Sequence, residues 1–78
     1  MTGLERITFD SQVKGGRACI RGMRITVSLI LNLIANGMTH EEILKAYPYL
    51  EAEDIQAALN YAVWLADESV YVVEHVAA

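Results

Sequence analysis

Residues 39–66 read THEEILKAYPYLEAEDIQAALNYAVWLA, and this stretch decides the fold. Thr39 and Glu42 have the spacing of a capping box, in which each side chain bonds to the backbone amide of the other residue. This pattern predicts the start of a short helix. Pro48 ends that helix, because the residue before a proline is disfavoured in the helical conformation. We therefore expect a short helix followed by a tight corner.

The sequence after the corner predicts a longer helix. Glu51, Glu53 and Asp54 put negative charge in its first turn, where the helix dipole favours it. Apolar residues then recur with the spacing i, i+3, i+4, i+7, i+8 and i+11, at Ile55, Ala58, Leu59, Ala62, Val63 and Ala66. This spacing indicates an amphipathic helix with one apolar stripe.

Residues 27–36 predict another helix upstream, with Thr26 or Ser28 as its cap and Asn36-Gly37 as its end. It is apolar almost all round, so it is buried on all sides, either in the core of one chain or against a second subunit. We expect Leu29 and Leu33 to contribute to a dimer interface. Three helices with this corner are typical of the homeodomain-like helix-turn-helix.

The first part of the chain predicts a short β-hairpin or ribbon. Residues 6–10 alternate apolar and polar side chains, Gly15-Gly16 is suited to a turn, and residues 18–20 read as a second strand. The alternation resumes at 24–27. Two strands alone are marginally stable in water, so the ribbon must lie on the helices or pair with another chain. We expect Phe9 and Ile20 to contribute to the dimer interface.

These elements make the predicted fold mainly α, a three-helix homeodomain-like helix-turn-helix with an N-terminal β-hairpin or ribbon. The 78 residues form a single domain, with the ribbon at 5–26, the helical core at 27–66 and an apolar tail at 67–78. The tail is consistent with a strand, a continuation of the helix, or a segment that orders on a partner.

Composition indicates a chain that needs a partner. Residues of the apolar class make up 54% of the sequence, more than the roughly 45–50% usual for a soluble domain. A domain of this size also has a small core. Cys19 is the single cysteine, and no apolar run is long enough for a signal peptide or a membrane span. We expect a cytoplasmic protein that binds itself and has no membrane contact.

Charge is divided unevenly along the chain. Residues 1–24 carry five basic and two acidic side chains, whereas residues 25–78 carry one basic and eight acidic ones. The candidate nucleic-acid contacts are Lys14, Arg17, Arg21 and Arg24, because arginine forks grip phosphate well. The other interpretation is that these cations pair with the acidic helices of the same chain or a sister chain.

The third helix is better suited to a protein than to DNA. A helix that reads bases offers Arg, Lys, Asn or Gln to the groove and needs cations for the phosphates. The predicted helix has no basic residue, and its acids would meet phosphates unfavourably. The candidate partner-binding residues are Glu53, Gln56, Asn60 and Trp64 on the helix and Tyr71 and Val73 in the tail.

No pattern in the sequence predicts catalysis. His40 and His75 are far apart and do not have metal-ligand spacing with Cys19, and no carboxylate pair stands out. A small cysteine without a nearby histidine is more typical of a buried core residue than of a nucleophile. We expect no enzyme activity, no cofactor, no metal and no small-molecule substrate.

Several short motifs resemble one family of small prokaryotic proteins, catalogued as domain of unknown function 433. They are RITFD at 6–10, GGR at 15–17, CIRG at 19–22, RI at 24–25, VS at 27–28, NGM at 36–38, EEIL at 41–44, YP at 47–48 and EDIQAAL at 53–59. The resemblance covers about residues 5–66. The family usually has Pro, Thr and Pro where this chain has Ala18, Met23 and Thr26, so the path of the ribbon is less rigid here.

The resemblance implies a homeodomain-like helix-turn-helix with an N-terminal ribbon. For some members it implies an antitoxin that neutralises a PIN-like nuclease toxin and represses its own operon through operator DNA. On this basis we expect a homodimeric antitoxin-like regulator. The alternative is a protein-only dimerisation or adaptor module whose arginines form salt bridges and never touch DNA.

Overall fold

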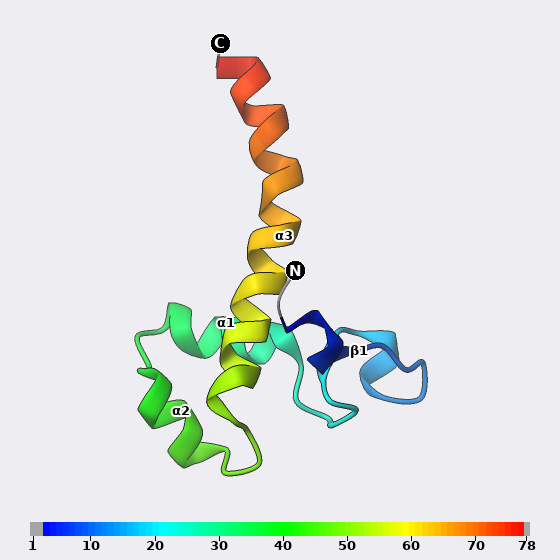
Figure 1. Cartoon of the computed structure of the whole chain (residues 1–78), viewed down its shortest axis with the longest axis vertical. Coiled ribbons are helices and arrows are strands. Elements are labelled where there is room, and N and C mark those ends of the chain that lie inside the picture. Colours follow the sequence, from blue (N-terminus) through cyan, green and yellow to red (C-terminus); the bar gives the residue numbers. More distant parts are fainter. Residues whose placement is uncertain (1–2, 78) are drawn as a thin grey trace.

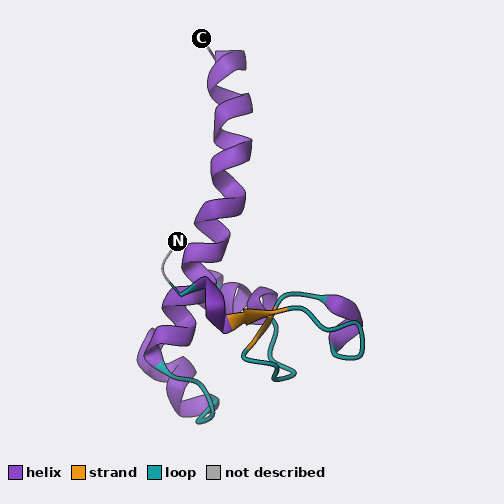
Figure 2. Cartoon of the chain, turned by 45° about the vertical axis from the view of Figure 1, so that its right-hand side comes forward, coloured by secondary structure: helices purple, strands orange, loops and turns teal. Residues whose placement is uncertain are grey.

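The computed structural model describes residues 3–77, and the surroundings of side chains are described for residues 3–67. Three helices follow a short antiparallel hairpin (Figures 1 and 2). The elements are β1 (Ile7–Thr8), β2 (Cys19–Ile20), α1 (Val27–Ala35), α2 (His40–Ala46) and α3 (Ala52–Ala77). The predicted fold class, mainly α with an N-terminal hairpin, is confirmed.

The hairpin is much shorter than the ribbon predicted over residues 5–26. Ile7 pairs with Ile20 and Thr8 with Cys19, and the pairing goes no further than one bridge between Cys19 and Thr26. The chain turns sharply after β2, where Arg21 and Gly22 both have positive φ, of 45° and 72°. This turn breaks the alternation that the sequence suggested.

The predicted ends of the first two helices are confirmed. Thr26 caps α1, since its hydroxyl accepts a hydrogen bond from the Leu29 amide at 3.0 Å. Gly37 follows that helix with a φ of 93°, which glycine adopts without steric cost. Thr39 and Glu42 form both hydrogen bonds of the capping box at the start of α2. That helix ends at Ala46, just before the predicted corner.

Four isoleucines, one from the hairpin and one from each helix, pack in the core. Ile20 of the hairpin, Ile30 of α1, Ile43 of α2 and Ile55 of α3 are each fully buried. The predicted role of Ile20 in a dimer interface is therefore wrong, because its side chain has no surface left for a second chain. Leu29 and Leu33 of α1 are half-buried and keep some exposed surface.

The third helix is longer than the helical core predicted from the sequence. It continues from Ala52 to Ala77 without a break at residue 66, so the segment predicted as a tail is the helical continuation of α3. Figure 1 shows its second half rising away from the other elements. The radius of gyration is 13.9 Å, compared with about 11.5 Å for a compact chain of this length.

Candidate functional site

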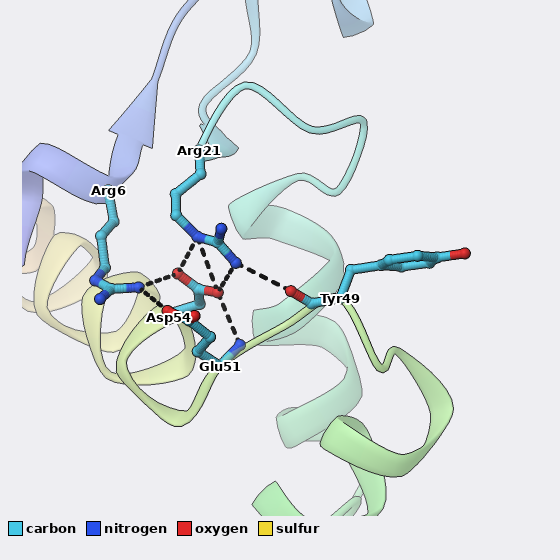
Figure 3. Close-up of polar contacts among 5 residues, drawn as sticks. All are labelled: Arg6, Arg21, Tyr49, Glu51 and Asp54. Carbon is cyan, nitrogen blue, oxygen red and sulfur yellow. Dashed lines mark hydrogen bonds and ion pairs between the residues drawn. The ribbon is translucent and has the colours of Figure 1, made fainter.

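Asp54 is a charged residue with no exposed surface at the start of α3 (Figure 3). The Arg21 guanidinium binds both carboxylate oxygens, with Nε 3.0 Å from Oδ1 and Nη2 2.8 Å from Oδ2. Arg6 Nη1 donates to Oδ1 at 2.8 Å, and the Glu51 amide donates to Oδ2 at 2.8 Å. The carboxylate is thus satisfied by two arginines that flank the strands of the hairpin and by the backbone just before α3.

These contacts decide the ionisation of Asp54. Burial by itself raises the pKa of the carboxyl group, but the hydrogen bonds from Arg21, the Glu51 amide and Arg6 lower it more. The net effect lowers the pKa of Asp54 to about 2. Asp54 is therefore ionised at neutral pH and holds two arginines.

The ion pairs fasten the hairpin to the corner between α2 and α3. Arg21 also donates from Nη2 to the Tyr49 carbonyl oxygen at 3.0 Å, and Arg6 binds Glu51 at 2.8 Å. Arg21 was predicted to contact nucleic acid, and that prediction needs correction because Asp54 and Tyr49 occupy most of its donors. For this arginine the alternative of pairing within the chain is the observed one.

Three other predicted nucleic-acid contacts stay on the surface. Lys14, Arg17 and Arg24 are exposed, and none of them forms an ion pair among the residues that the structure describes. Lys14 lies in the turn between the two strands, and Arg24 lies in the loop before α1. Both views of the fold place these loops on the side of the molecule away from α2 (Figures 1 and 2).

Predicted partner-binding residues come together on α3. Glu53, Gln56 and Asn60 line a shallow pocket of about 230 Å³ with Glu5 from the first turn of the chain. Gln56 donates to the Asn60 side-chain oxygen at 3.0 Å. We call Glu5, Glu53, Gln56 and Asn60 the acidic strip. Arg6, the one cation that lines this pocket, is already paired with Glu51 and Asp54.

A groove with aromatic walls lies beside the acidic strip. It has a volume of about 340 Å³ and is lined by Leu4, Ile7, Phe9, Tyr61 and Trp64, which we call the aromatic groove. The ring centroids of Phe9 and Tyr61 are 6.2 Å apart, and those of Tyr61 and Trp64 are 6.0 Å apart. Phe9 is 62% exposed and Trp64 46% exposed. Two large apolar side chains thus face solvent together.

The groove joins residues that the sequence assigned to different partners. Phe9 was predicted at a dimer interface and Trp64 at a partner interface, and the structure puts both on one surface. Leu4, Glu5 and Tyr61 were missed, because only the packing of the first turn on α3 brings them together. The side chains of Tyr71 and Val73 lie outside the described side chains.

The described residues contain no arrangement typical of a metal site. No group of three or more His, Cys, Asp and Glu side chains in residues 3–67 is placed to hold an ion. Cys19 is buried, with 2% of its surface exposed. Among the helices described, none is both long and apolar enough to cross a membrane.

Comparisons with known proteins point to one family. Residues 7–62 match the family model described as protein of unknown function (DUF433). The chain is 36% identical over 58 residues to the uncharacterized protein y4eO of Sinorhizobium fredii, covering 74% of this chain and 26% of that protein. It thus spans about a quarter of this relative.

A solved structure is also similar. The crystal structure of a DUF433 member from Anabaena variabilis matches with a TM-score of 0.74 and 35% identity. The match covers 81% of this chain and 62% of that one.

Proposed function

The chain belongs to the DUF433 family of proteins of unknown function, and from this premise we propose that it is the antitoxin of a toxin–antitoxin pair, which binds and neutralises a nuclease toxin. The observation that carries this proposal is the aromatic groove with the acidic strip next to it. In this proposal the protein acts by binding and catalyses no reaction.

The aromatic groove has the chemistry of a protein-binding surface. Tryptophan and other large aromatic side chains dominate the energy of protein interfaces, especially where a ring sits in a pocket at the centre. Phe9 and Trp64 supply such rings here, and both are partly exposed to solvent. A partner with an apolar side chain aimed at Tyr61 would bury all three rings.

The acidic strip supports a basic partner. A nuclease needs cations to bind the phosphates of its substrate, so its nucleic-acid surface is positively charged. Glu5 and Glu53 lie at the edge of the pocket on α3, and neither forms an ion pair within residues 3–67 that would compete with a partner. An antitoxin bound through this surface would cover the substrate site of the toxin.

Repression of the operon is the second part of the proposal. The exposed cations Lys14 and Arg24 support binding to DNA phosphates by the loops around the hairpin. The helix-turn-helix corner does not support the usual docking by α3, because Glu51 and Glu53 lie at the start of that helix and Asp54 is buried. The loops, rather than α3, would therefore contact operator DNA.

The alternative is a protein-only adaptor with no DNA binding. The internal pairing of Arg6 and Arg21 with Asp54 favours it, since two of the five N-terminal cations are already used within the chain. In this case the aromatic groove would still bind a protein.

Co-expression with the product of the adjacent gene tests the antitoxin role. We expect that product to arrest growth when it is produced alone, and the wild-type chain to restore growth and to co-purify with it. An adjacent product that neither slows growth nor co-purifies with this chain would contradict the proposal.

A further inference from the structure

The backbone of the second half of α3 extends beyond the other elements of the fold. Residues 66–77 extend about 18 Å at the helical rise of 1.5 Å per residue, beyond the hairpin and the other two helices (Figure 1). The packed first half of α3 nucleates this segment, but most helical stability in proteins comes from packing rather than from propensity. The segment needs a surface to lie against.

The sequence of α3 supplies an apolar stripe for that contact. Ile55, Ala58, Leu59 and Ala62 pack in the body or at its edge, whereas Ala66 is exposed. The same spacing of three and four residues continues along the sequence at Val70, Val73 and Ala77. Val63 and Leu65 add exposed apolar surface where the helix leaves the body, at 57% and 48%. The apolar stripe of α3 that packs in the core therefore continues beyond the core.

The amount of uncovered surface matches what a dimer buries. The accessible surface is 5421 Å², compared with about 4,700 Å² for a compact monomer of 8.7 kDa. The excess, about 700 Å², is close to the roughly 800 Å² that each partner buries in an interface of standard size.

The body has a second groove, which is largely apolar and has a cation among its lining residues. It lies between the start of α1 and α3, has a volume of about 490 Å³, and is lined by Val27, Leu31, Tyr61 and Leu65 with Arg17 among its residues. We call it the α1–α3 groove. It shares only Tyr61 with the aromatic groove, so the two can hold different partners.

The charges of α3 and of the α1–α3 groove indicate which helix binds in this groove. α3 contains no lysine or arginine, Asp67 is exposed, and the sequence adds Glu68 and Glu74 to its second half. Arg17 is exposed at the groove and has no ion pair among the described residues. The helix rises away from the body of its own chain (Figures 1 and 2). Acids of one copy and Arg17 of another are therefore complementary.

We propose that the α1–α3 groove holds the second half of α3 from a second copy of this chain, and that the exchange is reciprocal. A two-fold dimer of this kind repeats each contact twice, so both stripes are covered and both Arg17 residues meet acidic side chains. Arg17 then serves the dimer rather than a phosphate. The interface then joins the second half of α3 of one copy to the start of α1, to Tyr61 and Leu65 of α3 and to Arg17 of the other copy.

A charge placed in the stripe tests the interface. We would measure the mass of the full chain by sedimentation at concentrations from about 1 to about 100 µM, comparing Ala66→Glu with Ala52→Glu. Both positions are exposed alanines of α3, but Ala52 lies in its first turn, about 21 Å along the helix from Ala66. We expect a dimer for the wild type and for Ala52→Glu, and a monomer for Ala66→Glu. A monomeric wild type, or a dimeric Ala66→Glu, would overturn the proposal.

A charge exchange tests which groove is occupied. One variant carries Arg17→Glu, and a second carries both Asp67→Lys and Glu74→Lys. Each variant by itself should dimerise roughly tenfold or more weakly than the wild type, since like charges would then face one another. A one-to-one mixture of the two variants should restore dimer formation as a heterodimer. If the mixture stays as weak as its components, Arg17 does not face α3 and the proposed occupant of the groove is wrong. Circular dichroism of each variant checks that the helices are intact.

Discussion

Asp54 connects two parts of the chain that lie far apart in the sequence. Arg21 and Arg6 are 33 and 48 positions away from it, yet both guanidinium groups lie within 3.0 Å of its carboxylate. The carboxylate is fully buried while the arginines are partly exposed, with 26% of the Arg6 side chain and 36% of the Arg21 side chain accessible. Removing the buried charge should therefore affect stability more than removing an exposed charge elsewhere on α3.

Substitution of Asp54 by asparagine should destabilise the protein by about 2 kcal/mol. The amide keeps the size of the side chain but removes the charge that two arginines share, and the cost is below that of a fully buried pair because both arginines reach water. Urea unfolding at pH 7 measures the change. Glu53→Gln, which neutralises an exposed acid next to it, should change the free energy of unfolding by less than about 0.5 kcal/mol.

The same carboxylate makes stability depend on pH. The pKa of Asp54 in the folded chain, about 2, is below its usual value of 3.8, so the unfolded chain takes up the proton first. Its contribution is complete above about pH 5 and is lost as the pH falls toward 2. The difference in unfolding free energy between the wild type and Asp54→Asn should therefore narrow in acid. A difference that stays constant from pH 7 to pH 3 would show that folding does not lower the pKa of Asp54.

Contacts between residues a few positions apart could be predicted from the sequence, whereas the ion pairs of Asp54 with Arg6 and Arg21 could not. The capping box at Thr39 and Glu42 depends on atoms three residues apart, so its sequence pattern is enough. The sequence allowed Arg21 to pair with an acidic helix but offered eight acids after residue 24 as partners. Only the packing of the hairpin on the corner selects Asp54.

At the scale of elements, helix ends were predicted better than strands. Caps, a glycine stop and a proline fix the ends of α1 and α2 through local geometry. The ribbon was predicted too long because alternation alone did not reveal the turn at Arg21 and Gly22, where φ is positive. The length of α3 stayed open because the β-branched residues near its end favour a strand by propensity, although the segment is helical.

The contribution of the capping box of α2 to the stability of the protein should be measurable. Thr39→Ala removes the hydroxyl that accepts from the Glu42 amide at 3.1 Å, and should cost about 1 kcal/mol in the free energy of unfolding. Thr39→Ser keeps the hydroxyl and should stay close to the wild type. Equal stability of the two variants would mean that α2 does not depend on this cap.

At the scale of the whole molecule, the exposed cations Lys14 and Arg24 lie apart from the acidic strip. The loops with Lys14 and Arg24 lie away from α2 (Figure 1), and the lining residues place the acidic strip and the aromatic groove along α3. The sequence predicted this division of charge, and four of its six partner-binding residues lie on that side of α3. It could not predict the aromatic groove, because Phe9 reaches Tyr61 only through the folded hairpin.

DNA binding by the loops should weaken steeply with salt. We expect a mobility shift with the upstream promoter fragment whose affinity falls as salt rises. In the double variant Lys14→Ala with Arg24→Ala, the plot of log affinity against log salt concentration should be shallower. Its slope should change by about 0.9 for each phosphate that the variant no longer neutralises. Arg21 is left intact because it supports the fold. Lys45→Ala, which removes an exposed cation from α2, should leave the shift unchanged. Absence of a shift even at low salt would favour the protein-only adaptor.

The proposed function depends on toxin binding at the aromatic groove. Its most direct test is the affinity of the purified chain for the adjacent gene's product, measured by titration calorimetry for the wild type, Phe9→Ala with Trp64→Ala, and the control Tyr49→Ala. Tyr49 is an aromatic residue that is 73% exposed and lies outside the groove. We predict that the double variant binds roughly thirtyfold or more weakly, as expected for aromatic anchors, and that the control binds like the wild type. Equal affinities of the double variant and the control would contradict the account.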